Sequence, residues 1–238
     1  MRVRRFGLIE HPDFNDVVVH FTGRSGPSHS SPEVARMTDW QRLQSIVAAG
    51  ELRGFEMPGA RASAACFTEA TAAGCSWLIR SHRYTSCGLA FRKDLLFGSG
   101  GGPVLQVRGD EWDAVGSWPA RLRARAVRLW PGADADGPET LPWWLSGRSE
   151  WLYEREWRVP TLTGPFTFCL DDVAFLVLPS VEALHDWVRS LARSEPKLAR
   201  ALARCRYVVL GPTGIVEANG VAAREGRLGS SSPPSPTS

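Results

Sequence analysis

The sequence predicts an α+β fold in which helices flank a split sheet of mixed or antiparallel strands. Stretches of strand type outnumber helical stretches and gather in the middle of the chain, whereas α/β proteins alternate strand and helix throughout. No G-x-G-x-x-G follows a strand, and no G-x-x-x-x-G-K-[ST] occurs anywhere. A doubly wound nucleotide-binding sheet is therefore not expected.

The composition indicates one folded domain. The chain has 238 residues, of which 43% are hydrophobic and 22% charged, which is ordinary for a globular protein and excludes wholesale disorder. We expect residues 1–220 to form a single domain. Residues 221–238 lose apolar character and end in Ser-Ser-Ser-Pro-Pro-Ser-Pro-Thr-Ser, which predicts a disordered tail.

Several classes of protein are not expected from the sequence. No apolar run approaches the length of a transmembrane helix, and the arginine-rich N-terminus lacks the apolar segment of a signal peptide. The cysteines form no C-x-x-C pair and the histidines form no H-x-x-x-H. We therefore expect a cytoplasmic protein with reduced thiols, without a metal site and without membrane contact.

The elements of the N-terminal half follow from residue type and spacing. Residues 17–22 are β-branched and aromatic, which favours a strand. Between residues 33 and 49, apolar residues recur at helical spacing before Gly50, a natural stop for a helix. A short buried strand is expected at 64–69, followed by a helix at 71–82.

The C-terminal half predicts further strands and one late pair of helices. Residues 88–91 and 103–107 look like paired strands joined by a glycine-rich connection. Residues 111–149 contain five tryptophans without a clear period and are expected to be irregular. Apolar runs of sheet type and the helical segments between them complete the chain, with strands at 157–159, 173–178 and 207–210 and helices near 181–192 and 194–204.

Arginine dominates the basic residues. Of 28 lysines and arginines, 26 are arginine, which reflects either genomic base composition or a role in binding phosphate, because a guanidinium group can donate two hydrogen bonds to one phosphate. In one segment arginine recurs at almost every second position, which in a strand would place three guanidinium groups on one face. We interpret this segment as a candidate nucleic-acid contact, made of Arg121, Arg123, Arg125 and Arg128.

Three separated segments carry candidate chemistry. His20 and Thr22 lie two apart at the end of the first strand, so their side chains share a face, although a strand-end histidine also commonly bonds a loop carbonyl. Cys66–Glu69 is a short strand ending in an acid, which alternatively caps the next helix. Glu154 and Glu156 are either two interacting carboxylates or members of an exposed ladder of salt bridges.

In this order the segments resemble the ADP-ribosyltransferase superfamily, in particular its bacterial toxin and phage-defence branch with the DarT-like DNA modifiers. The phrases Glu-x-Glu-Trp-Arg and Cys-Phe-Thr-Glu are also similar to bacterial abortive-infection proteins. The resemblance spans roughly residues 17–160 and rests on His20-Phe21-Thr22, the helical phrase from Leu43 to Leu52, Cys66–Glu69 and Glu156.

The resemblance implies an ADP-ribosyltransferase-like fold and an NAD-dependent enzyme that modifies a nucleic acid or a protein. In that reaction a carboxylate stabilises the oxocarbenium-like ribose that forms as nicotinamide leaves. By resemblance this carboxylate is Glu156, while Glu154 addresses the acceptor. The other implied contacts with NAD are His20 for a ribose hydroxyl, Thr22 beside it, Phe67 or Tyr84 for stacking on nicotinamide, and Arg24 for the pyrophosphate.

The same resemblance leaves two alternatives open. An RNA 2′-phosphotransferase would need several basic residues around its phosphate, whereas only Arg24 lies near the first segment. A non-catalytic binding protein of the antitoxin type would keep the scaffold without the reaction. If the chain is a toxin, the resemblance also implies a cognate antitoxin protein as a partner.

Overall fold

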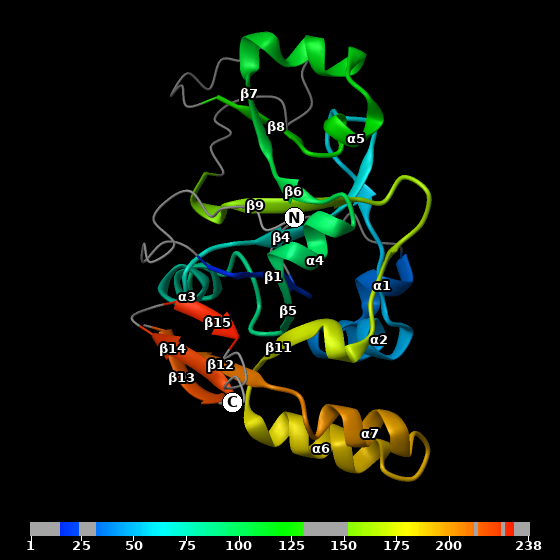
Figure 1. Ribbon diagram of the computed structural model, residues 1–238, viewed down its shortest axis with the longest axis vertical. Coiled ribbons are helices and arrows are strands. Elements are labelled where there is room, and N and C mark those ends of the chain that lie inside the picture. Colours follow the sequence, from blue (N-terminus) through cyan, green and yellow to red (C-terminus); the bar gives the residue numbers. More distant parts are fainter. Residues whose placement is uncertain (1–14, 24–31, 131–151, 212–213, 225–226, 231–238) are drawn as a thin grey trace, which may run out of the picture.

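A computed structural model of the chain describes residues 15–23, 32–130, 152–211, 214–224 and 227–230 (Figure 1). At its centre lies a nine-stranded sheet. Eight of the strands follow one another in the spatial order β13 (Gly214–Asn219), β12 (Tyr207–Gly211), β11 (Val173–Leu178), β5 (Gly88–Arg92), β1 (Val17–Phe21), β4 (Ser63–Thr68), β9 (Glu156–Pro160) and β6 (Gly102–Pro103), and β3 (Phe55–Glu56) also pairs with β4.

Three two-stranded sheets accompany the central sheet in the described residues. They are β2 (Glu51–Leu52) with β10 (Phe166–Thr167), β7 (Leu105–Arg108) with β8 (Ala126–Leu129), and β14 (Val221–Arg224) with β15 (Arg227–Ser230). This last hairpin lies in the segment that the sequence assigns to a disordered tail, while residues 231–238 of that tail lie outside the described residues.

The helices flank the central sheet (Figure 1). The described α-helices are α1 (Pro32–Arg36), α2 (Asp39–Ala49), α3 (Ala72–Arg80), α4 (Lys93–Gly98), α5 (Ala120–Arg123), α6 (Val181–Leu191) and α7 (Pro196–Leu202). The 3₁₀ helices in the described residues are η1 (Gly109–Ser117), η2 (Leu152–Glu154) and η3 (Leu170–Asp172).

The hydrogen-bond pattern makes the sheet mixed, which confirms the predicted α+β class. β11 and β12 run parallel and are connected through α6 and α7, whereas the other neighbouring pairs are antiparallel. β1 and β4 meet at a single register pair, Val19 with Thr68. The sheet therefore opens between these two central strands.

The helix expected at 33–49 is divided in two because Thr38 starts a new helix. Its hydroxyl accepts a hydrogen bond from the Gln41 N–H at 3.1 Å, and the Gln41 side chain accepts one from the Thr38 N–H at 2.9 Å. This reciprocal arrangement is a capping box and fixes the start of α2. At the other end Gly50 adopts a left-handed conformation (φ 64°), as its sequence position predicts.

The pairing expected between residues 88–91 and 103–107 is wrong. β5 lies between β1 and β11, whereas β6 pairs with β9 and β7 pairs with β8. The glycine-rich connection follows α4, and its residue Gly100 has a φ of 81°. Strand location was therefore predictable here, but the partner strand was not.

The arginine segment does not form the expected strand. Arg121 and Arg123 lie in α5, Arg125 follows it, and Arg128 lies in β8. The first part of the segment, Ala-Arg-Leu-Arg-Ala, consists of strong helix formers, which explains the helical start. The guanidinium groups are therefore not arranged by strand alternation.

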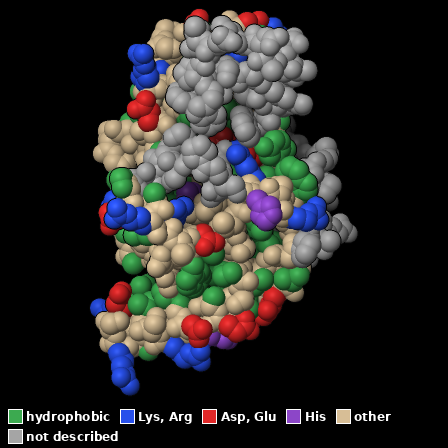
Figure 2. Space-filling model, turned by 180° about the vertical axis from the view of Figure 1, so that it is seen from behind, with side chains coloured by type: hydrophobic (Ala, Val, Ile, Leu, Met, Phe, Trp, Pro, Cys, Tyr) green, Lys and Arg blue, Asp and Glu red, His purple; other side chains and the backbone are tan. Residues whose placement is uncertain are grey.

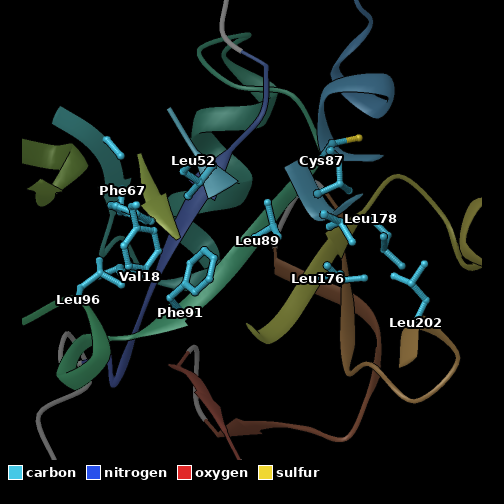
Figure 3. Packing of buried hydrophobic residues seen from close by; sticks show 14 of the residues in the cluster. Val18, Leu52, Phe67, Cys87, Leu89, Phe91, Leu96, Leu176, Leu178 and Leu202 are labelled. Atoms are coloured by element: carbon cyan, nitrogen blue, oxygen red, sulfur yellow. The ribbon is translucent and has the colours of Figure 1, made fainter. Parts of the chain in front are cut away.

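The central sheet separates two buried apolar clusters. One contains Val18 and Phe67 with Leu43 of α2, and its packing appears in Figure 3. The other contains Val19 and Phe21 with Leu78 of α3. Because neighbouring residues of a strand point to opposite faces, Val18 and Val19 belong to different clusters. We call the two sides of the sheet the α2 face and the α3 face.

Both acidic and basic side chains lie along the lower end of the molecule in Figure 2, the end formed by α6 and α7. Glu182 and Asp186 of α6 are both exposed there.

Phe91→Ala is expected to lower the free energy of unfolding by about 3–5 kcal/mol, because it empties a closely packed site. Phe91 is 0% exposed, and its ring centroid lies 5.9, 5.5 and 5.0 Å from those of Phe67, Phe166 and Phe168. The matched control is Phe97→Ala in α4, where the ring is 72% exposed. Urea unfolding should show a change of no more than about 0.5 kcal/mol for this control, and equal losses in both variants would contradict the packing.

Candidate functional site

The three segments singled out in the sequence lie on neighbouring strands. His20 belongs to β1, Cys66 to β4, and Glu156 begins β9, and these strands are adjacent in the order β1-β4-β9 (Figure 1). In the register of the sheet, Thr68 is opposite Val19 on one side and opposite Glu156 on the other.

This register divides the site residues between the two faces of the sheet. Residues paired across antiparallel strands share a face, so Glu156 and Thr68 point to the α3 face with Val19. His20 directly follows Val19, and Phe67 directly precedes Thr68, so both side chains point to the opposite face, the α2 face. The structure thus brings Glu154, Glu156 and Tyr84 together, and it holds His20, Thr22 and Phe67 apart from them.

Glu154 ends η2 and is 4% exposed. Its Oε1 accepts a hydrogen bond from Arg83 Nε at 2.8 Å, and its Oε2 accepts one from the Tyr84 hydroxyl at 2.6 Å. Burial raises the pKa of the Glu154 carboxyl above its ordinary value, against the opposing charge of Arg83, and Glu156 raises it further. A buried carboxyl with a raised pKa beside a second carboxyl is typical of catalytic sites.

Glu156 is held by Arg158, two residues further along β9. Arg158 Nε and Nη2 donate to Glu156 Oε1 and Oε2 at 2.8 and 2.9 Å, and Nη1 donates to the Ala126 carbonyl at 2.7 Å. Burial opposes the charge on Arg158, but Glu156 outweighs it and the pKa of Arg158 is raised. The Cys66 thiol also donates to Glu156, so of the four lone pairs of the carboxylate one remains beyond these contacts to accept a further hydrogen bond.

The Cys66 thiol lies beside this ion pair. Burial, together with the charge of Glu156, raises the pKa of Cys66 well above its ordinary value. The thiol is therefore protonated at neutral pH, which makes it a poor nucleophile.

His20 bridges the opening between β1 and β4. Its Nδ1 lies 2.8 Å from the Cys66 carbonyl oxygen, and its ring meets that of Phe67 edge-on at 5.8 Å. Burial lowers the pKa of His20, so the ring is neutral at pH 7. A carbonyl only accepts, so Nδ1 carries the proton and Nε2 is left as an acceptor. The sequence alternative for His20 was a bond to a loop carbonyl, whereas the carbonyl that it contacts belongs to Cys66 of strand β4.

The remaining predicted NAD contacts have structural partners of their own. The Thr22 hydroxyl donates to the Asp39 carbonyl at 2.8 Å, which ties β1 to the start of α2. Phe67 is 2% exposed and packs among other rings, so it offers no free surface for stacking. Tyr84 stacks on Phe21 with centroids 5.0 Å apart. Arg24 lies outside the described residues.

Glu69 is the centre of an ion network that the sequence analysis did not identify. Its Oε1 lies 2.7 Å from both Lys93 Nζ and Arg155 Nη2, and its Oε2 accepts from Trp157 Nε1 at 2.7 Å. Glu69 does not cap the next helix, as was one expectation, because the Thr71 hydroxyl accepts the Gly74 N–H there. The only sequence signal was an acid at the end of a buried strand.

Two arginines of the predicted nucleic-acid contact lie over the glycine turn after α4. A Cβ at Gly102 would come within 2.5 Å of Arg125 Nη1, and a Cβ at Gly100 within 3.5 Å of Arg121 Nη2. Gly102 is the register partner of Arg158. Arg125 therefore covers the edge of the sheet on the α3 face, which also carries Glu156.

No family model, no curated protein and no solved structure matches this chain. Among the described residues, no helix has both the length and the apolar character needed to span a membrane. The same residues contain no group of three or more His, Cys, Asp or Glu side chains able to hold a metal ion. All five cysteines are free thiols.

The raised pKa of Glu154 predicts how stability depends on pH. The folded state binds the Glu154 proton more tightly than the unfolded state, so this group loses stabilising effect as pH rises from 4.5 through the folded pKa. The free energy of unfolding of the wild type minus that of Glu154→Gln should fall over this window, by at most about 1.4 kcal/mol per pH unit. Urea unfolding at several pH values tests this, and a rising difference would contradict the desolvated environment.

Glu69→Ala is expected to cost about 3–5 kcal/mol of stability, because it leaves partly buried cations without their carboxylate. Glu51→Ala is the matched control, since Glu51 pairs with an Arg53 whose side chain is 80% exposed. Its loss should stay below about 1 kcal/mol. Thermal unfolding of both variants measures the difference, and comparable small losses would show that the Glu69 network does not stabilise the fold.

Proposed function

We propose that this chain is an NAD-dependent ADP-ribosyltransferase whose reaction takes place on the α3 face of the sheet, with a nucleic acid or a protein as acceptor. The observation that carries the proposal is the pair of adjacent carboxylates, Glu154 and Glu156, at the start of β9. Their partners differ, so they are suited to different tasks. The adjacency of the three motif-bearing strands adds support.

Glu156 has the properties needed to stabilise a ribosyl cation. Splitting the glycosidic bond of NAD releases nicotinamide and develops positive charge on the ribose. Arg158 fixes both oxygens of Glu156 in one orientation, and beyond the Arg158 and Cys66 hydrogen bonds one lone pair of the carboxylate remains for a ribose hydroxyl. Such fixed orientation is what a group acting only in the transition state requires.

Glu154 is suited to proton transfer at the acceptor. A general base works best when its pKa is near the working pH, and burial shifts the pKa of Glu154 in that direction. The Tyr84 hydroxyl, hydrogen-bonded to Glu154 Oε2, orients the carboxylate from the other side. In this proposal Glu154 accepts the proton of the incoming nucleophile, while Glu156 faces the ribose.

His20 has a structural task in this proposal. Its protonated Nδ1 holds the Cys66 carbonyl across the opening between β1 and β4. Only the Nε2 acceptor remains for a ligand, and it belongs to the α2 face. The neutral ring therefore supports β4, the strand next to Glu156, without touching the reacting bond.

A second candidate is a non-catalytic binding protein on the same scaffold. It is favoured by the fact that both carboxylates are already neutralised, Glu154 by Arg83 and Glu156 by Arg158. Such a protein would use the arrangement for stability alone. Binding and turnover of NAD separate the two candidates.

NAD should stabilise the wild-type protein and be cleaved by it. At about 100 times its dissociation constant NAD is expected to add roughly 2.7 kcal/mol to the free energy of unfolding. Glu156→Gln keeps the shape but removes the charge, so it should lower turnover by about 100-fold or more while the NAD-induced thermal shift remains. Glu154→Gln should reduce transfer to acceptor more than hydrolysis of NAD.

The matched control is Glu56→Gln in β3, an exposed glutamate away from the two carboxylates, which should behave like the wild type. Nicotinamide release measures turnover. If millimolar NAD leaves the unfolding temperature of the wild type unchanged, the enzyme proposal fails and the binding protein is favoured. If Glu154→Gln abolishes NAD cleavage and Glu156→Gln does not, the two roles are reversed.

A further inference from the structure

A pocket lies between α6, the turn that follows α7, and the edge of the central sheet. The helices α6 and α7 pack side by side at the end of the sheet that carries β12 and β13 (Figure 1). The pocket has a volume of about 400 Å³ and is lined by residues from each of these segments. Volumes of this size are typical of sites for small molecules. We call it the α6 pocket.

The α6 pocket lies on the face of the sheet opposite to the two carboxylates. Tyr207 lines it and is the register partner of Leu176, which belongs to the cluster on the α2 face. Asn219, the partner of Tyr207 in β13, shares that face and also lines the pocket. Four strands separate β12 from β9, the strand of Glu156, which corresponds to about 24 Å along the sheet.

The floor of the α6 pocket is apolar. Leu184 is buried in the cluster on the α2 face, and Val188, one turn later on α6, packs against the same cluster with Cys205 and Tyr207. Burial raises the pKa of the Cys205 thiol to about 11, so this group is neutral and behaves as a small apolar side chain. The floor is therefore an open border of the core, and a ligand with an apolar body would cover it.

The walls of the α6 pocket are polar. On the helix side, Arg189 lies one turn after His185, and both side chains line the pocket. Arg189 forms an ion pair with Asp186, but these side chains are 77% and 68% exposed, so the pair contributes little and most guanidinium donors remain available. On the strand side, the Asn219 side chain has no hydrogen-bond partner in the described part of the chain.

We propose that the α6 pocket binds a small aromatic carboxylate. The ring covers the apolar floor beside Tyr207, the carboxylate accepts hydrogen bonds from Arg189, and a polar edge of the ring faces Asn219. This ligand needs neither NAD nor the two carboxylates on the α3 face, so the inference goes beyond the proposed function and does not depend on it.

Charge and shape select this class of ligand. Arg189 provides a positive charge at the pocket, whereas Glu182 and Asp186 on the same helix limit how much negative charge the site tolerates. A single carboxylate therefore fits better than a doubly charged phosphate. A ring is favoured over an alkyl chain because it can meet the Tyr207 ring in a stacked or edge-on arrangement.

The experiment is a calorimetric titration of the full chain with 2-naphthoate in the absence of NAD. Three further probes separate the contributions: 2-naphthamide keeps the ring without the charge, 2-naphthyl phosphate carries more negative charge, and octanoate keeps the carboxylate without the ring. 2-Naphthoate should bind about 10-fold more tightly than 2-naphthamide, the difference that a charged hydrogen bond produces. It should also bind about 2- to 10-fold more tightly than octanoate and more tightly than the phosphate.

Two variants with matched controls locate the site. Arg189→Gln should weaken binding of 2-naphthoate by about 10-fold and leave 2-naphthamide unchanged, whereas Arg193→Gln, at an exposed arginine outside the pocket, should change neither. Ala203→Trp should block the pocket, since Ala203 is exposed and lines it. Ala192→Trp is its control, because Ala192 is exposed at the end of α6 but does not line the pocket. Unfolding temperatures without ligand confirm that all four variants fold.

Several results would overturn the proposal. The wild type failing to bind 2-naphthoate at millimolar concentration would do so, as would equal affinity for 2-naphthamide, octanoate or the phosphate. Binding that Arg189→Gln leaves unchanged would overturn it even if Ala203→Trp does not fold. Displacement of 2-naphthoate by NAD would show that the two ligands share a site. A chain that binds 2-naphthoate but shows no thermal shift with NAD would lose the proposed reaction and keep this pocket, so the two failures are distinguishable.

Discussion

The carboxylate of Glu69 is the constraint on which the geometry of the site depends. It joins Lys93 at the start of α4 to Arg155 and Trp157, which flank Glu156 on either side. A backbone hydrogen bond also joins the two segments, because the Glu69 N–H donates to the Arg155 carbonyl at 3.2 Å. With both neighbours of Glu156 anchored on the α2 face, Glu156 itself is directed to the α3 face. A buried ion network is a weak source of net stability, but here it fixes the positions of three side chains, each with a polar atom 2.7 Å from the Glu69 carboxylate.

The backbone conformation of Arg155 explains why Glu154 and Glu156 lie close together. Its φ of 46° lies in the left-handed region, which costs a residue with a Cβ roughly 1–2 kcal/mol. The chain changes there from the 3₁₀ turn of η2 to the strand β9, so simple alternation does not relate the two acids. The ion pair with Glu69, at 2.7 Å, holds the side chain of Arg155 in place and offsets that cost. Strain of this kind occurs where the surrounding structure requires a special position.

Local composition predicted most elements, whereas contacts between distant residues set the site. The β-branched run at β1 and the apolar period of α2 determine local structure, so both were found in the sequence, although the Thr38 capping box divides the expected helix. The arginine segment was misjudged because alternation was weighed above the helix propensity of Ala and Leu. Glu69 could not be recognised, since Lys93 and Arg155 lie 24 and 86 residues further along the chain.

Register decides which motif residues can act together, and register is invisible in the order of motifs along a chain. His20 and Glu156 lie on strands that both border β4, yet Glu156 is opposite Thr68 and His20 is one residue beyond Val19, the other partner of Thr68. A shift of one residue exchanges the faces of every side chain on a strand. Because His20 is one residue beyond Val19, its neutral ring lies on the α2 face, where its hydrogen bond to the Cys66 carbonyl joins β1 to β4 across the sheet opening. The acids face α3 with Arg83 and Tyr84, so any reaction that they perform must be approached from that side.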